Sequence, residues 1–228
     1  TSTTTTFAGD EKSLIILCHG LLGNMNNLCY GELARALCGH GSIFRFDFSG
    51  EGPLSQGNFE YGNYVKQVSE LHSVITYWQG QGYTIRAIVG HSKGANIVLM
   101  YHSFYPPFVS SHGNDDSDRD EDNKNHEVST SIPLVVAISG RFHLSQSPSN
   151  RFTERQQQLL REEGKFLWKK LSWFMRDGGD GGSGSGDDGS VKCRTVVRPC
   201  WVTQRSIDMR AHINMPRLLR EQVNHASS

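Results

Sequence analysis

Residues 87–100 read AIVGHSKGANIVLM, and this stretch decides the fold. An apolar run with the composition of a buried strand enters its centre, and an apolar run of helical length leaves it. The centre is a G-x-S-x-G pentapeptide made of Gly90, His91, Ser92, Lys93 and Gly94. Strand and helix approach so closely at such a turn that a side chain at either glycine would collide with the neighbouring backbone. The pattern therefore predicts a nucleophile elbow, a strained turn that lifts the hydroxyl of Ser92 clear of a sheet.

A second motif follows the first strand-like run of the chain. The run LIILC at residues 14–18 is typical of a buried parallel strand, and it leads directly into HGLLG. A strand that ends in H-G-x-x-G predicts a loop that gives one backbone NH to an oxyanion hole, while the residue after the nucleophile gives the other. Those two donors would be the NH groups of Leu21 and Lys93. We expect His19 and Gly20 to support this loop rather than to react, because the base of this machinery follows the serine in the chain.

Alternating strands and helices are expected around these two motifs. Hydrophobic spacing predicts helices over residues 27–37 and 64–79, and strands over residues 42–48 and 132–139. Asp47 lies near the end of one of these strands. It precedes the nucleophile, whereas the acid of such a triad follows it, so we expect Asp47 to fix a loop.

Three stretches together resemble a known family, namely ILCHGLLGNMNN, FRFDFSGEGPLSQGNF and IVGHSKGANIVLMY. They look like the small-ester α/β-hydrolases related to bacterial cinnamoyl and feruloyl esterases and to serine aminopeptidases, over about residues 14–144. The resemblance implies a mostly parallel sheet with helices on both faces, a nucleophile at Ser92, oxyanion donors at Leu21 and Lys93, and elbow support from His91. The family often has a small residue or Gln after the serine, so Lys93 would put a cation at the mouth of the site.

The chain divides into a core and later segments. We expect residues 1–150 to form the hydrolase core, with residues 112–127 as an acidic, disordered insertion whose carboxylates fit no EF-hand spacing. The helical spacing over residues 151–176 predicts the helical lid that the resembled family carries at this point. Residues 177–190 form a Gly/Ser/Asp-rich linker, and residues 191–228 are expected to be the rest of the lid or the start of a truncated C-terminal half.

Composition limits the partners and the compartment. Lys plus Arg and Asp plus Glu both number 23, so the chain has no global basic field that would recruit nucleic acid. The five cysteines form no C-x-x-C pair, and we expect reduced thiols in a cytoplasmic protein without metal or cofactor. No apolar run approaches the roughly 18 residues of a membrane-spanning helix, and no secretory signal is expected.

The basic residues of the predicted lid helix have two readings. They would suit peripheral contact with an anionic membrane, although a solvated basic face is the simpler interpretation. These residues are Arg161, Lys165, Lys169, Lys170 and Arg176.

A base for the serine is harder to place. In the resembled fold, the acid and the histidine follow the serine on later strands, and no such strands are predicted after residue 139. Three hypotheses remain: the terminal strands are missing; the local residues Asp208, His212 or His225 stand in; or the chain is a catalytically dead fold that binds a ligand or partner. The first predicts a serine hydrolase of carboxylic esters or related small acyl substrates, acting through an acyl-enzyme on Ser92 and nearly inactive in this form.

Overall fold

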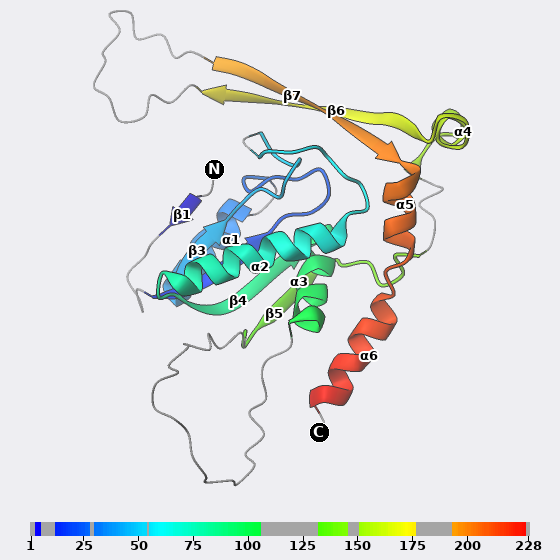
Figure 1. Cartoon of the computed structure of the whole chain (residues 1–228). Coiled ribbons are helices and arrows are strands. Elements are labelled where there is room, and N and C mark those ends of the chain that lie inside the picture. Colours follow the sequence, from blue (N-terminus) through cyan, green and yellow to red (C-terminus); the bar gives the residue numbers. More distant parts are fainter. Residues whose placement is uncertain are drawn as a thin grey trace, which may run out of the picture.

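A computed structural model describes residues 3–5, 12–27, 30–53, 55–105, 132–145, 151–176 and 193–226. The acidic segment 112–127 and the linker 177–190, both predicted from composition, lie outside these described residues. Within the described part, no helix is both long enough and apolar enough to cross a bilayer. Figure 1 shows a sheet layered with helices below a long two-stranded ribbon.

A five-stranded sheet forms the centre of the molecule. Its strand order is β1-β3-β2-β4-β5, with β1 antiparallel to β3 and every other neighbouring pair parallel. The strands are β1 (Thr3–Thr5), β2 (Ser13–Cys18), β3 (Ser42–Arg45), β4 (Thr84–His91) and β5 (Val135–Ile138). The strands predicted around residues 14–18, 42–48, 85–89 and 132–139 are confirmed.

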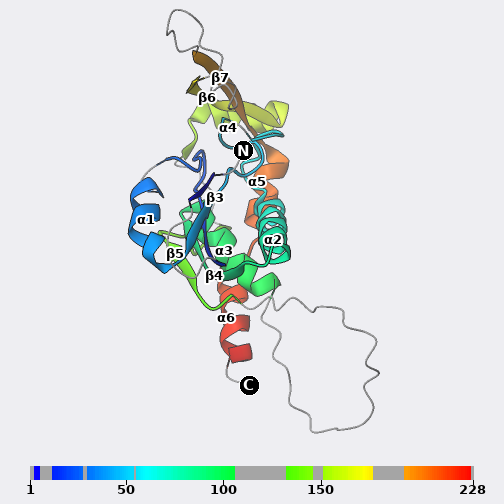
Figure 2. The same ribbon diagram turned by 90° about the vertical axis from the view of Figure 1, so that its left-hand side faces the viewer.

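Helices cover both faces of the sheet, as predicted. Every residue of β2 is buried because its successive side chains point to opposite faces, and both faces are covered. Leu14 and Ile16 pack with helices α2 and α3, whereas Ile15 and Leu17 pack with α1. Figure 2 shows α1 on one side of the sheet and α2 on the other.

The helix bounds agree closely with the hydrophobic spacing. The predicted helices 27–37 and 64–79 are observed as α1 (Tyr30–Leu37) and α2 (Tyr64–Gly80), and α3 (Lys93–Phe104) follows the elbow. Pro216 lies in the first turn of the last helix, where its missing NH disrupts no helical hydrogen bond. The remaining elements are the 3-10 turn η1 (Cys38–His40) and the helices α5 (Gln204–Ala211) and α6 (Met215–Ala226).

The helical lid predicted over residues 151–176 is wrong in its second half. Helix α4 (Glu154–Glu163) begins with a capping box between Thr153 and Gln156, and it ends at Gly164, which has φ 70°. The chain then forms strand β6 (Lys165–Arg176), which pairs antiparallel with β7 (Cys193–Thr203). Phe166 and Trp168 contribute to one face of this β6–β7 ribbon, where they pack against the loops of the core. Burial of alternate side chains therefore favours a strand over a continued helix.

Candidate active site

Ser92 occupies a strained turn between β4 and α3. Its backbone has φ 56° and ψ −115°, a conformation that a residue with a side chain adopts only when the surroundings hold it there. The Ser92 NH donates to the carbonyl of Ile138 at 2.8 Å, and the Ser92 carbonyl accepts from the NH of Ala95 at 3.1 Å. The parallel neighbour β5 and the first turn of α3 thus fix the serine backbone from both sides.

The glycines around Ser92 allow three backbone segments to meet. A Cβ added to Gly90 would lie 2.2 Å from the carbonyl oxygen of Gly94. A Cβ on Gly94 would lie 2.3 Å from the carbonyl oxygen of Cys18, and one on Gly20 would lie 3.0 Å from the Cβ of Ser92. The loop after β2 therefore lies directly against the serine turn.

The loop after β2 is a tight turn in which the Leu22 NH bonds to a side chain and the Leu21 NH has no acceptor among the described residues. The Gly23 NH donates to the Gly20 carbonyl at 3.0 Å, and Leu22, with φ 60°, donates its NH to Glu51 Oε2 at 3.1 Å. Among the described residues, no acceptor takes a hydrogen bond from the backbone NH of Leu21 or of Lys93. These two positions are the ones at which the sequence predicts oxyanion donors.

His19 links two loops beneath the turn. Its Nε2 accepts a hydrogen bond from the Phe48 NH at 3.1 Å, and its Nδ1 lies 2.9 Å from the Gly20 carbonyl. Because one partner is an NH and the other a carbonyl, we assign the proton to Nδ1. Both ring nitrogens are engaged and the side chain is buried, so His19 is not placed to take a proton from Ser92.

Lys93 lies inside the protein and not at the mouth of the site, which corrects the sequence-based expectation. Its Nζ donates to Glu51 Oε1 at 3.0 Å and to the Glu60 carbonyl at 3.4 Å, and it lies 5.3 Å from the centre of the Tyr64 ring. The side chains of Lys93 and Glu51 are each only 1% exposed. Burial of the lysine is possible because a carboxylate and a carbonyl satisfy its ammonium group.

Glu51 is the residue that sequence reasoning missed. Besides Lys93, its Oε1 accepts from Gln67 Nε2 at 3.0 Å, while its Oε2 accepts from the Leu22 NH and lies 3.9 Å from His19 Nδ1. One buried carboxylate thus connects α2, the residue after the serine and the loop after β2. The sequence signal for this role was an acidic residue placed between two glycines, Gly50 and Gly52, in the turn that follows β3.

Asp47 fixes the same loop from its other end. Its Oδ1 accepts a hydrogen bond from the Met25 NH at 2.7 Å, which is the loop-fixing role expected from the sequence. Burial raises the pKa of this carboxyl above its ordinary value, since its surroundings disfavour the charged form.

Solved structures place this architecture in a known fold. A monoacylglycerol lipase of Paleococcus ferrophilus is 21% identical, with 97% of this chain and 72% of that chain covered and a TM-score of 0.51. A proposed hydrolase of Agrobacterium vitis S4 is 17% identical, with 85% and 61% covered and a TM-score of 0.51. The chain has the α/β-hydrolase fold.

Other comparisons are shorter or find no match. Est1E of Butyrivibrio proteoclasticus, solved with ferulic acid bound, is 22% identical over 46% of this chain and 43% of that chain, with a TM-score of 0.42. The chain thus spans less than two thirds of the length of Est1E and of the Agrobacterium protein. No family model matches the chain, and no curated protein matches it.

A serine nucleophile in the α/β-hydrolase fold needs a base nearby, and the histidines of the described residues are the candidates for it. Among them, no histidine forms a hydrogen bond with Ser92, and His91 Nδ1 is buried without a partner. His212 caps the end of α5 one turn after Asp208, but its Nδ1 lies 2.6 Å from the backbone carbonyl of Asp208 and not from its carboxylate. His143 and His212 line one cavity of about 420 Å³, whose lining does not include Ser92. The side chain of His225 lies outside the described set.

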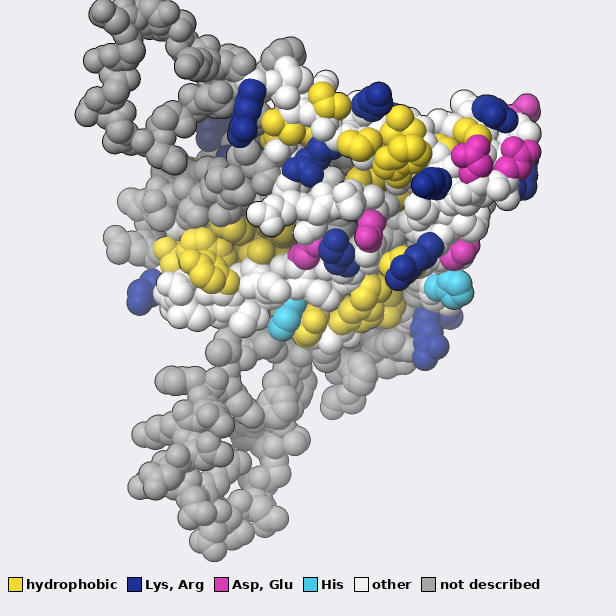
Figure 3. Space-filling view, turned by 45° about the horizontal axis from the view of Figure 1, so that its top comes forward, with side chains coloured by type: hydrophobic (Ala, Val, Ile, Leu, Met, Phe, Trp, Pro, Cys, Tyr) yellow, Lys and Arg dark blue, Asp and Glu magenta, His cyan; other side chains and the backbone are white. Residues whose placement is uncertain are grey.

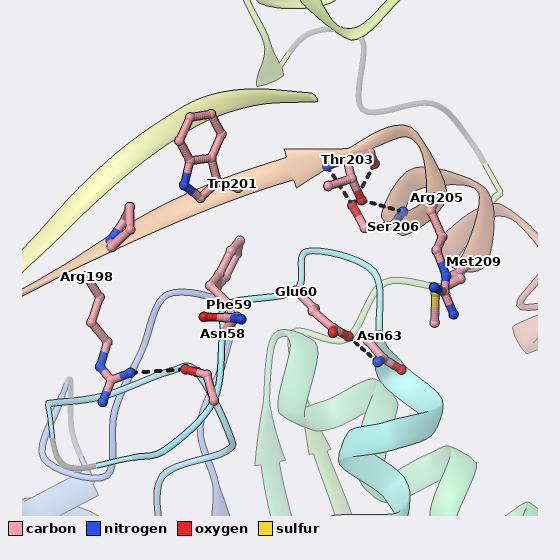
Figure 4. A pocket seen from close by; sticks show the side chains of 13 residues that line it. Asn58, Phe59, Glu60, Asn63, Arg198, Trp201, Thr203, Arg205, Ser206 and Met209 are labelled. Atoms are coloured by element: carbon pink, nitrogen blue, oxygen red, sulfur yellow. Dashed lines mark hydrogen bonds between the residues drawn. The ribbon is translucent and has the colours of Figure 1, made fainter. Parts of the chain in front are cut away.

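A larger cavity lies between the core and the β6–β7 ribbon. It measures about 610 Å³, and Figure 4 shows it bounded by β7 and the start of α5 on one side and by the loop before α2 on the other. Phe59 points toward β7, while Arg198 reaches down to the carbonyls of Ser55 and Gly57. Ser92 does not line this cavity either. Within the described residues, no group of three or more His, Cys, Asp or Glu side chains could hold a metal ion.

Proposed function

We propose that this chain is a serine hydrolase of carboxylic esters or related acyl bonds, and that it forms an acyl-enzyme on Ser92. The observation that carries this proposal is the strained backbone of Ser92, at φ 56°, with the Gly20 loop lying directly against it. A serine is held in such a conformation when its hydroxyl has to stand clear of the sheet. The α/β-hydrolase fold supports the same class of chemistry.

In the proposed reaction, the Ser92 Oγ attacks the acyl carbon of the substrate while a base takes its proton. The NH groups of Leu21 and Lys93 would then donate to the oxyanion of the tetrahedral intermediate, which is supported by their lack of any other acceptor in the described residues. Collapse of the intermediate expels the alcohol and leaves the acyl group on Ser92. Water would then release the acid by the same two steps.

The proposal includes a slow turnover. A serine hydroxyl is a weak nucleophile until an imidazole accepts its proton, and no histidine of the described residues forms a hydrogen bond with Ser92. Loss of a triad member typically lowers turnover by about four orders of magnitude or more. We therefore expect hydrolysis by this chain to be near the level that oxyanion stabilisation and substrate binding alone can give.

A second candidate is a hydrolase fold that binds a ligand or a partner without catalysis. The lack of a hydrogen bond between Ser92 and any histidine of the described residues favours it. The cavity under the ribbon would then be the place to look for a ligand, since it is bounded by Phe59 and Arg198 and does not involve Ser92.

The experiment that separates the two candidates is the intact mass of the protein after exposure to a fluorophosphonate probe. The matched variants are Ser92→Ala and Ser73→Ala, since Ser73 lies exposed on α2. A slow mass shift that Ser73→Ala retains and Ser92→Ala loses would support the hydrolase proposal with its slow turnover, and a fast shift would mean that a base activates Ser92 after all. No shift even after prolonged exposure, in a protein that unfolds cooperatively, would contradict the hydrolase proposal and favour the binding protein.

A further inference from the structure

The β6–β7 ribbon concentrates positive charge in a chain whose formal net charge is zero. Its two strands contain six basic residues and no acidic one. The basic residues are Lys165, Lys169, Lys170, Arg176, Arg194 and Arg198. The neighbouring carboxylates of Glu162 and Glu163 belong to α4, before the ribbon begins. The charge balance of the whole chain therefore hides an excess of positive charge on these two strands.

The ribbon has a packed inner face. Phe166 and Val202 are buried in a cluster with Phe59 and Tyr61 of the core. Leu21, from the loop beside Ser92, packs against the same cluster. This inner face anchors the ribbon and leaves the opposite face available.

The outer face carries apolar side chains beside lysines. On β7, Val197 is 55% exposed and Trp201 is 44% exposed, with the exposed Pro199 between them. On β6, Lys170 pairs in register with Pro199, and the Lys165 Nζ lies 5.7 Å from the centre of the Trp201 ring. Figure 3 shows hydrophobic side chains over the ribbon with Lys and Arg side chains around them.

The lysines of this face have no anionic partner in the described structure. Among the ion pairs found in the described residues, none involves Lys165 or Lys170. The headgroup region of a lipid bilayer accommodates large apolar side chains that lie next to unpaired cations. The lysine ammonium groups would bind lipid phosphates, and the Trp and Val side chains would enter the boundary between headgroups and acyl chains.

We propose that the outer face of the β6–β7 ribbon binds an anionic lipid surface. Charge complementarity identifies the occupant as anionic, and the row Val197, Pro199, Trp201 selects lipid over nucleic acid. Two of these three side chains are aliphatic and offer neither base stacking nor hydrogen bonds. Because the inner face of the ribbon packs on the cluster that includes Leu21, a bound surface would lie on the side of the molecule that carries the Ser92 turn. The proposal concerns adsorption and does not depend on hydrolysis.

The test measures binding of the whole chain to vesicles of phosphatidylcholine alone or mixed with phosphatidylserine, by cosedimentation. The ribbon variant is Lys165→Gln with Lys170→Gln, and the matched control is Lys66→Gln with Arg86→Gln, which removes two exposed cations from α2 and β4. Each lysine near an anionic surface contributes about 1 kcal/mol, so the ribbon variant should partition into mixed vesicles about 30-fold less. The control should change by less than about threefold, and about 1 M salt should abolish binding by the parent chain.

A second readout tests the apolar row. Trp201→Ala and Val197→Ser should each weaken binding to mixed vesicles at low salt by several-fold, while thermal unfolding stays cooperative. Absence of binding to mixed vesicles, or equal binding to neutral ones, would overturn the proposal. Equal loss in the control variant would also overturn it, because the effect would then reflect net charge and not the ribbon. If the protein does not bind vesicles but binds a DNA or RNA oligonucleotide through Lys165 and Lys170, the surface is a nucleic-acid site and the lipid proposal is wrong.

Discussion

Lys93 Nζ lies 3.0 Å from Glu51 Oε1, and this buried ion pair joins the residue after the serine to the loop after β3. Glu51 also holds the Leu22 NH at 3.1 Å, so the pair and the loop beside Ser92 share one carboxylate. Desolvation of two charges is costly, and the arrangement is stable only because each charge has its partner and further hydrogen bonds. The position of the two amides next to Ser92 therefore depends on a charge pair that no substrate would touch.

Replacing Lys93 by Met should destabilise the protein by about 3–5 kcal/mol, because it leaves the Glu51 carboxylate buried without its cation. Chemical denaturation monitored by tryptophan fluorescence measures the change. Lys66→Met, at an exposed position of α2, is the matched control and should stay within about 0.5 kcal/mol. Adding Glu51→Gln to Lys93→Met should recover part of the loss. If Lys93→Met unfolds at the same denaturant concentration as Lys66→Met, the pair does not form.

Gly90→Ala should lower the free energy of unfolding by about 3 kcal/mol or abolish cooperative unfolding, since its Cβ would fall 2.2 Å from the backbone oxygen of Gly94. Gly80→Ala is the control, because a Cβ at this last residue of α2 meets no atom within 4 Å. We expect Gly80→Ala to be neutral or to stabilise by up to about 1 kcal/mol. Equal stabilities of the two variants would show that strand and helix do not approach as described.

Asp47→Asn should change how stability depends on pH. Burial raises the pKa of the Asp47 carboxyl in the folded state, so the folded protein holds this proton to higher pH than the unfolded chain does. Stability from this group is therefore present below the unfolded pKa of about 3.9 and is lost as the pH rises through the folded value. Urea unfolding at a series of pH values should show the parent losing stability relative to Asp47→Asn across that window. If the parent instead gains stability relative to Asp47→Asn as the pH rises across this window, the pKa of Asp47 is lowered in the folded state.

Alkylation should distinguish the cysteines. Cys18, Cys38 and Cys200 are free thiols, as predicted for the described ones. Burial raises the pKa of Cys200 to about 11, and it raises that of Cys18 further above its ordinary value. At pH 8 roughly one Cys200 side chain in a thousand would be thiolate. Peptide mass spectrometry after iodoacetamide should therefore find Cys38 modified first, with all three labelled in urea. Labelling of Cys200 at the rate of Cys38 would contradict the burial.

The core and the serine turn were predictable because local pattern and tertiary structure agree there. Buried parallel strands are apolar along their whole length, and the glycines of G-x-S-x-G are required by backbone contacts that any such turn makes. The segment after α4 was not predictable in the same way. The register of β6 shifts between Leu167 and Lys169, which interrupts the alternation of a strand and leaves an apolar spacing that resembles a helix. Gly164 was the signal of a helix end, and a partner strand many residues later completed the ribbon.

The burial of Lys93 could not be predicted because its partner is distant in sequence. Nothing local separates a lysine that extends into solvent from one that turns inward to a carboxylate 42 residues away. The same holds for the base, since a triad is defined by positions in space and not by spacing along the chain.

The contact of Arg198 with the carbonyls of Ser55 and Gly57 has a consequence for the timing of folding. These partners are 143 and 141 residues apart in the chain. On the ribosome, at about 5–20 residues per second, the loop before α2 leaves the exit tunnel several seconds or more before Arg198 does. Until then the loop has neither this cation nor the inner face of the ribbon, and its buried rings Phe59 and Tyr61 are exposed. The nascent chain is thus most open to chaperones, and to misassembly, in the interval between the synthesis of α3 and that of β7.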